Sequence, residues 1–192
     1  MIDMENTYFD ASNDGVIPIV PGQYPAHVCG FEGREVQTKI GTQKVFNVEF
    51  KIADAVNKME IIKHQYVEDK LVPMMEDGKA VKVSASFMNA KQFKSTGIWL
   101  TENPAEGEGW RNRNYVNFFQ GIGVVFPKVN DKVKLAEVEE TDILGLPVFV
   151  KLDKEYYQKD GEERSTWKVF SATAWLDGEK ISQDEVKEDV PF

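Results

Sequence analysis

The order of apolar and polar residues along the chain predicts a protein built mainly of β-strands. From residue 44 to 53 the two kinds alternate, and a period of two is typical of a strand with one buried face. Similar patterns predict strands over residues 24–31, 59–67, 81–87 and 97–101. Two longer strands, over 146–157 and 165–176, flank Asp160-Gly161, and this dipeptide between alternating runs is a strong signal for a β-hairpin.

One helix stands out among these strands. Its apolar stripe has the i, i+3, i+4, i+7 spacing of a helix face that packs on a core, and it consists of Tyr115, Phe118, Phe119 and Ile122. Asn112 or Asn114 is a suitable N-terminal cap, and Gly121 and Gly123 mark the end of the helix.

Four stretches between and before these elements have weaker patterns. Residues 32–43 are polar with two glycines, and we expect a long hairpin tip there. A short helix is predicted over 68–75, and a flexible loop over 102–109. The segment 16–22 contains two prolines, which favour an edge strand or a packed extended arm.

Three strands, irregular inserts, one helix and a closing hairpin are the element order of the oligonucleotide/oligosaccharide-binding (OB) fold. We therefore predict a mainly β, OB-fold-like five-stranded barrel with one main helix and long inserts. A generic α+β or β-sandwich fold stays open as the alternative. The predicted organisation is an N-terminal arm at 1–21, the barrel domain at 22–176 and an acidic tail at 177–192.

The composition argues against several classes of site. Cys29 is the only cysteine and His27 and His64 are the only histidines, so a disulfide, a zinc site or a Ser-His-Asp centre is not expected. Glu49-Phe50-Lys51 matches half of a nuclease motif but reads more simply as a strand. We expect no enzyme activity, no cofactor and no metal. No apolar run approaches the about 18 residues of a membrane span, and the N-terminus does not resemble a signal peptide, so we expect a cytoplasmic protein without a membrane partner.

The net charge of the chain argues against nucleic-acid binding, whereas the distribution of charge along it argues for such binding. The chain carries 32 acidic and 23 basic residues, a net charge of −9, and an acidic surface repels nucleic acid. Residues 78–134, however, contain nine basic and four acidic residues, and none of the acidic ones lies between Lys79 and Thr101. The objection to nucleic acid therefore depends on where these charges lie in the fold.

Aromatic residues are interleaved with the basic ones in this central segment. Single-stranded nucleic acid is bound by this combination, because cations follow the phosphates and exposed rings stack on bases. Lys44 and Lys63, on the predicted first sheet, are added as flanking cations. The candidate DNA-binding residues are Lys44, Lys63, Lys91, Phe93, Lys94, Trp99, Trp110, Arg111 and Arg113. For each aromatic residue, a place in the core is the competing interpretation.

The C-terminal 16 residues contain six acidic residues and two lysines, and we expect a tail that does not pack. The last five, Glu188-Asp189-Val190-Pro191-Phe192, resemble the tail tip of bacterial single-stranded DNA-binding proteins, and the outline is similar to phage-type members with one OB domain and a short tail. In that family the tip docks on replication and repair proteins. The resemblance implies partner-binding roles for Asp184, Glu185, Glu188, Asp189, Val190, Pro191 and Phe192.

The leading hypothesis is a non-catalytic protein, a monomer or small homo-oligomer, that binds and protects single-stranded DNA without sequence preference. The resemblance implies a role in phage-type replication or recombination, with the tail recruiting partner enzymes. The alternative is an acidic protein-interaction module or DNA-mimic inhibitor, for which the net charge of −9 is itself the binding feature. A metal-dependent nuclease is a third, weaker possibility.

Overall fold

The computed structural model describes residues 17–68, 70–130, 132–182 and 184–185. The fold is mainly β, with one main helix. The principal strands are β1 (Gly22–Thr38), β2 (Gly41–Ile52), β9 (Gln92–Lys94), β10 (Ile98–Thr101), β13 (Pro147–Lys159) and β14 (Glu162–Ala174). The helices are α1 (Arg113–Gly121) and α2 (Glu140–Ile143), with 3₁₀ turns at Asp54–Lys58, Ala85–Met88 and Gly109–Asn112. Shorter strands are β3 (Glu60–Ile62), β4 (His64–Val67), β5 (Lys70–Pro73), β6 (Met75–Glu76), β7 (Lys79–Ala80), β8 (Lys82–Ser84), β11 (Lys128–Val129) and β12 (Lys132–Val133).

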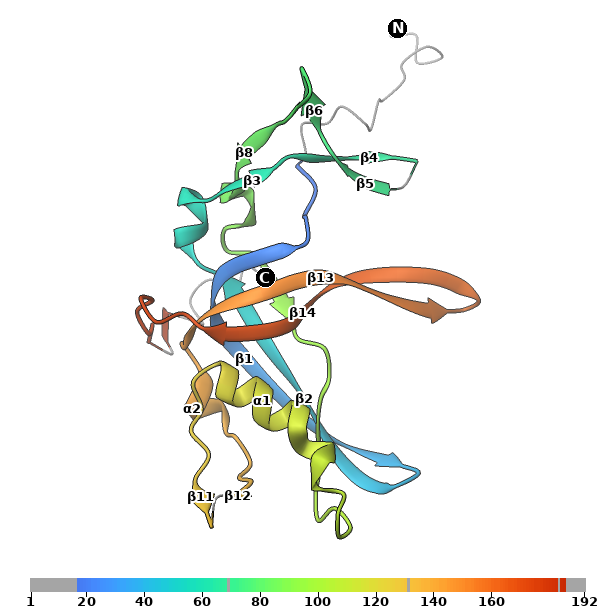
Figure 1. The fold of residues 1–192 in the computed structure, drawn as a ribbon, viewed down its shortest axis with the longest axis vertical. Coiled ribbons are helices and arrows are strands. Elements are labelled where there is room, and N and C mark those ends of the chain that lie inside the picture. The colour runs from blue at the N-terminus through green and yellow to red at the C-terminus, as the bar shows by residue number, and fades with distance from the viewer. Residues whose placement is uncertain (1–16, 69, 131, 183, 186–192) are drawn as a thin grey trace, which may run out of the picture.

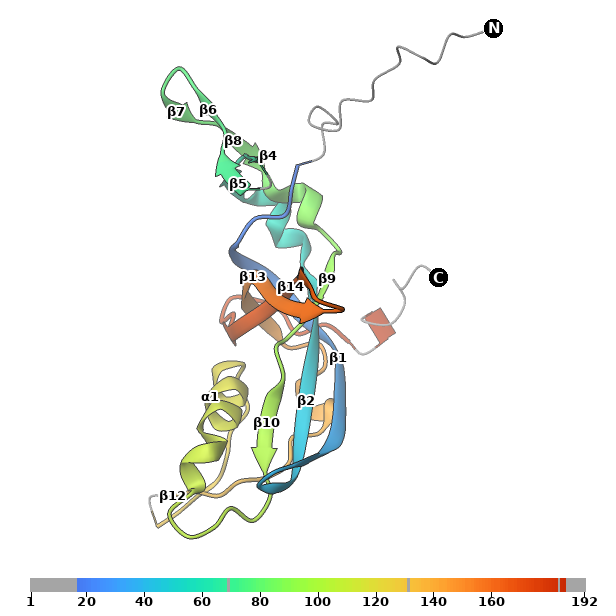
Figure 2. The same cartoon turned by 90° about the vertical axis from the view of Figure 1, so that its right-hand side faces the viewer.

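One antiparallel sheet forms the body of the molecule, in the order β10-β2-β1-β13-β14, and β9 also pairs with β2. Five of the predicted strands, those at 24–31, 44–53, 97–101, 146–157 and 165–176, lie in this sheet and are confirmed. Alternation along β2 has the predicted cause, since Val48, Phe50 and Ile52 are buried in the core. Figure 1 shows the two long hairpins extending from the same side of the body. Helix α1 lies beside β10 (Figure 2), and its Phe119 ring packs near the rings of Phe31 in β1 and Phe46 in β2.

The two ends of the sheet meet at a single point. Ser95, between β9 and β10, forms an isolated parallel bridge to Val169 of β14, and the Thr96 amide donates to the Val169 carbonyl at 3.0 Å. The Ser95 hydroxyl is buried and accepts a hydrogen bond from the amide of Val48. Apart from this bridge, the ladders of the described residues leave the sheet open, so the predicted closed barrel is not confirmed.

The hairpin of β1 and β2 is longer than the sequence pattern predicts. Residues 32–43 form the outer end of this hairpin, as expected, but they are paired as strands out to Thr38 and Gly41. This half of the hairpin extends beyond the core, and most of its side chains on both faces are exposed. This part of the hairpin is stabilised by backbone pairing and by polar contacts such as the 2.8 Å hydrogen bond from Gln37 Nε2 to Thr42 Oγ1. Such interactions do not require alternating apolar residues, so the sequence pattern does not show them.

Residues 60–84, called the insert below, depart most from the prediction. The expected strand over 59–67 is divided into β3, which pairs with β8, and β4, which pairs with β5. The expected helix over 68–75 is wrong, because this stretch forms β5 and β6. These local hairpins stand at one end of the molecule, away from the main sheet (Figure 2). Only part of their apolar surface reaches the core, so apolar content alone could not assign their pairing.

Helix α1 is confirmed where it was predicted, and its end at Gly121 is confirmed as well. Tyr115, Phe119 and Ile122 are fully buried. Asn112, one of the two predicted caps, occupies the N-cap position, but its side chain makes no capping hydrogen bond. Its side chain instead accepts from the Thr101 amide at 2.7 Å and donates to the Thr101 carbonyl at 3.0 Å, which anchors the start of α1 to the edge strand β10.

The closing hairpin is also confirmed. Asp160 and Gly161 have φ of 56° and 80°, as a two-residue turn of type I′ requires. The pairing of β13 with β14 shifts by one residue, because Leu152 faces Val169 while Lys151 faces Ser171. Phe170 is therefore the extra residue of a β-bulge.

Both ends of the described chain pack on the body. Residues 17–20 form no strand, but Val20 is buried and its carbonyl accepts from the Tyr24 hydroxyl, as expected for a packed arm. Near the other end, the Ile181 amide donates to the Gly145 carbonyl at 3.2 Å. Gly145 has φ +76°, and a Cβ there would overlap the Ile181 carbonyl, which explains the glycine. The expectation that the chain stops packing at Asp177 is therefore wrong for this stretch.

Candidate nucleic-acid interface

Several cations predicted to bind DNA are already neutralised by carboxylates. Lys44 Nζ lies 3.0 Å from Glu102 Oε1 and 2.7 Å from Glu137 Oε2. These two hydrogen-bonded carboxylates raise the pKa of Lys44, Glu137 contributing most. A phosphate would have to displace both of them to reach this lysine.

Lys94 and Arg111 have the same kind of partner. Lys94 Nζ lies 2.6 Å from Glu49 Oε1 across the β2–β9 ladder, and this hydrogen bond raises the pKa of the lysine. Arg111 forms a two-point pair with Glu108, at 2.8 and 2.9 Å, and its guanidinium also lies over the Trp110 ring at 4.9 Å. Two of the cations predicted to bind DNA in segment 78–134 are therefore already paired with carboxylates.

The remaining candidate DNA-binding residues do not form one patch. Phe93 is only 8 % exposed and packs in the core, so its predicted stacking role is wrong. Trp99 and Trp110 are exposed. Lys63, Lys91 and Arg113 have no ion pair with any other described residue, but Lys63 lies in the insert and Arg113 at the start of α1. Figure 1 shows these two elements at opposite ends of the molecule.

Only the start of the predicted partner-binding tail is described. Asp184 and Glu185 are exposed, and Glu185 Oε2 accepts 2.8 Å hydrogen bonds from the amide and hydroxyl of Ser182. These bonds lower the pKa of Glu185. Glu188, Asp189, Val190, Pro191 and Phe192 lie outside the described residues, so their predicted role stays a prediction.

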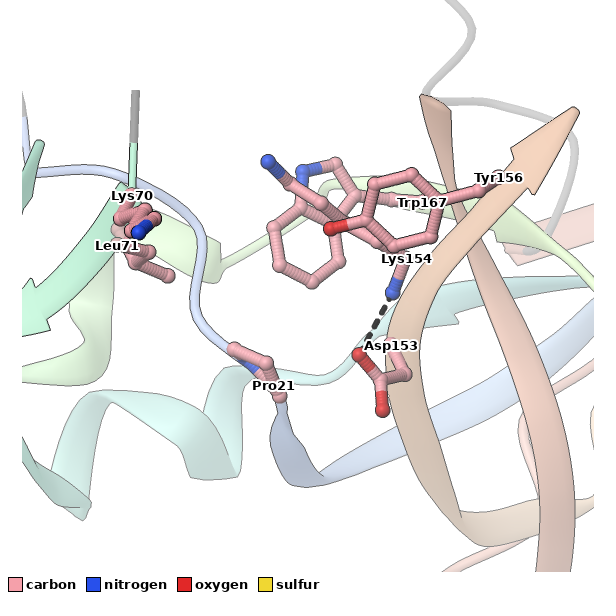
Figure 3. A pocket seen from close by; sticks show the side chains of 7 residues that line it. All are labelled: Pro21, Lys70, Leu71, Asp153, Lys154, Tyr156 and Trp167. Carbon is pink, nitrogen blue, oxygen red and sulfur yellow. Dashed lines mark hydrogen bonds between the residues drawn. The ribbon is translucent and has the colours of Figure 1, made fainter. Parts of the chain in front are cut away.

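A different group of aromatic and basic side chains gathers between the insert and the β13–β14 hairpin. They surround an open cavity of about 320 Å³. Figure 3 shows Lys154, Tyr156 and Trp167 together on the hairpin, with Lys70 and Leu71 of β5 across the cavity. The cavity is lined by Pro21, Lys70, Leu71, Asp153, Lys154, Tyr156 and Trp167.

Lys154 is the centre of this group. Its Nζ lies 5.3 Å from the centroid of the Tyr66 ring and 5.6 Å from that of Trp167, within cation–π range of both. The Tyr66 hydroxyl accepts from the same nitrogen at 3.4 Å. The neighbouring Asp153 accepts from the backbone amide of Lys154, and no described carboxylate lies within ion-pairing distance of Nζ. The ammonium therefore lies near two rings and has no carboxylate partner among the described residues.

We define the aromatic–lysine site as Tyr66, Lys70, Lys154, Tyr156 and Trp167. Tyr66 and Tyr156 are exposed rings, Trp167 is partly buried, and Lys70 is an exposed lysine beside them. The site thus offers flat apolar faces for bases and, for phosphates, two lysines that form no ion pair with any described residue, the two requirements of single-strand binding. Local density of charge could not reveal it, because its members come from segments far apart in the sequence. The one local signal is Lys154 and Tyr156 on the same side of a strand.

Comparisons of the chain with protein-family models, with curated proteins and with solved structures found no match. Within the part of the chain that the structure describes, no group of three or more His, Cys, Asp or Glu is arranged to hold a metal ion. The described helices are all too short or too polar to cross a membrane.

Proposed function

We propose that the protein binds single-stranded nucleic acid without sequence preference, and that the aromatic–lysine site is a principal contact surface. The observation that carries the proposal is the Lys154 ammonium, which lies within cation–π distance of the Tyr66 and Trp167 rings and has no carboxylate partner among the described residues. A lysine with a purely structural role would be expected to pair with a carboxylate. A cation beside an exposed and a partly buried ring favours a ligand that brings both negative charge and flat apolar surface.

The order of the main strands supports an OB-type barrel as the scaffold. Helix α1 lies between β10 and β13 in the chain. The sheet has the strand order β10-β2-β1-β13-β14, and the two ends of this sheet meet at the Ser95–Val169 bridge. In that architecture the loops between the first two and the last two strands flank the binding face. The two long hairpins β1–β2 and β13–β14 occupy these positions.

We propose further that the protein protects single-stranded DNA during phage-type replication or recombination and recruits enzymes through its C-terminal tail. The last five residues carry this part of the proposal, on their resemblance to the family's tail tip. The Phe192 ring suits capture in an apolar pocket with a basic rim. The acidic residues that precede it would steer the tail towards such a rim.

The direct test is a fluorescence-anisotropy titration with labelled oligo-dT, with duplex DNA as competitor. We expect binding that is tight at low salt, weakens as salt rises and resists the duplex, because single-strand binding releases counterions and uses base faces. Lack of binding at low salt would contradict the proposal and favour the acidic interaction module. Cleavage of the oligonucleotide on addition of magnesium would favour the nuclease instead.

Glu49 is expected to oppose binding, because its carboxylate takes the place beside Lys94 that a phosphate would use. Glu49→Gln should tighten oligo-dT binding by about two- to fivefold at low salt, the range of a partly exposed ion pair. The titration above measures this change. The matched control is Glu163→Gln, because Glu163 is exposed, lies near the hairpin tip and has no ion pair among the described residues. Equal effects of both substitutions would show that only net charge matters.

A further inference from the structure

A second cavity lies between α1, the start of β10 and the end of β14, and the aromatic–lysine site does not include it. Its volume is about 460 Å³ and it is open to solvent. It is lined by Thr96, Gly97, Ile98, Asn114, Asn117, Phe118, Gly121, Phe170, Ser171, Ala172 and Thr173.

Phe170 gives this cavity an exposed aromatic face. It is the extra residue of the β14 bulge, and it is 44 % exposed while Val169 and Ala172 beside it are buried. A bulge changes the direction in which a side chain points, and bulges are frequent next to binding sites. The bulge therefore turns a large apolar ring away from the core and into the cavity.

The polar groups around the cavity are all uncharged. They are the amides of Asn114 and Asn117 and the hydroxyls of Thr96, Ser171 and Thr173. Asn114 and Asn117 are three residues apart on α1, so they lie on the same side of the helix. Neither side-chain amide has a hydrogen-bond partner among the described residues, so both are available to a ligand.

This combination fits a nucleobase better than a phosphate or an apolar peptide. A phosphate would require cations, and none lines the cavity. A base presents a flat face that stacks on a ring and an edge of donors and acceptors, and an asparagine amide pairs with the adenine edge through two hydrogen bonds.

We propose that this cavity is a second nucleobase site, in which Phe170 stacks on the base and Asn114 and Asn117 bind its edge, with a preference for adenine. The inference rests on the proposed function, because the base belongs to the same bound strand. Trp167 and Phe170 are three residues apart on β14, a backbone separation of about 10 Å. The protein then combines general single-strand binding with one position that discriminates between bases.

The test compares three labelled oligonucleotides of about 12 nucleotides: oligo-dA, oligo-dT and a mainly abasic strand of the same length. Phe170→Ala should weaken oligo-dA binding about tenfold and leave the abasic strand unaffected, since only stacking is lost. Phe170→Trp should retain the affinity, and its tryptophan fluorescence should be quenched on binding by more than that of the wild type. The double variant Asn114→Ala, Asn117→Ala should abolish the preference of oligo-dA over oligo-dT.

The matched control is Tyr157→Ala, which removes a ring of similar exposure, 42 %, from the same hairpin but from neither cavity. Thermal unfolding of each variant reports whether it is folded. Equal affinities of Phe170→Ala and Tyr157→Ala for oligo-dA, with the wild type binding tightly, would overturn the second site alone. Failure of the wild type to bind any of the strands would overturn the proposed function and this site with it.

Discussion

Replacement of Trp167 by alanine is expected to weaken oligo-dT binding at least tenfold. Stacking of one base on an aromatic ring contributes about 1–3 kcal/mol, and this substitution removes the largest ring of the aromatic–lysine site. The same ring lies 5.6 Å from Lys154 Nζ, so its loss also removes part of the support that positions this cation. Anisotropy titrations at two salt concentrations measure the affinity and show whether its salt dependence stays unchanged.

Two further variants make this test decisive. Trp167→Phe retains a stacking face and should restore most of the affinity. Trp110→Ala removes an exposed ring from the segment 78–134, which the sequence analysis predicts to bind DNA and in which Arg111 is paired with Glu108. A large loss of oligo-dT affinity with Trp110→Ala and none with Trp167→Ala would contradict this prediction. It would show that DNA binds at the basic segment 78–134 and not at the aromatic–lysine site. Because Trp167 also packs against the core, thermal unfolding should accompany each titration.

The second large effect concerns stability. Phe119→Ala should lower the free energy of unfolding by about 3–5 kcal/mol, as truncation of a buried phenylalanine does. Phe119 is fully buried at the contact between α1 and the sheet, with its ring centroid 4.8 Å from that of Tyr115, 6.1 Å from Phe31 and 6.5 Å from Phe46. A protein of this size is stable by only about 5–15 kcal/mol, so the variant should unfold at much lower denaturant concentration.

Urea unfolding followed by circular dichroism measures this loss. The control is Val125→Ala, since Val125 is 88 % exposed and its truncation should change the free energy of unfolding by less than about 0.5 kcal/mol. A loss below about 1 kcal/mol for Phe119→Ala would show that α1 does not pack on the sheet as described. Loss of α1 packing would also remove one wall of the cavity beside Phe170.

Elements that bury one face were predictable from the sequence. The alternation over β2 and the helical stripe of Tyr115 and Phe119 both arise from burial, and the Asp160-Gly161 turn arises from backbone conformation. The strand pairing of the insert and of the outer half of the β1–β2 hairpin was missed. Their strands are held by backbone pairing with most side chains exposed, and pairing of this kind does not depend on a hydrophobic pattern.

The candidate binding residues, too, could be predicted only in part from the sequence. From the sequence, Lys94 and Lys44 lie in or beside a basic region, but in the fold Glu49 and Glu137 lie within ion-pairing distance of them. Charges are neutralised by neighbours in space, and strand pairing decides which residues become neighbours.

The sequence by itself determined the main strands, the one helix and the candidate residues for single-strand binding. Only the tertiary structure decided which cations stay unpaired and which rings stay exposed, and it brought Tyr66 and Lys154 together from segments 88 residues apart. The physical reason is range: hydrophobic periodicity is a local property of the chain, whereas an ion pair, a cation–π contact or an exposed ring depends on residues that only folding brings within a few ångströms.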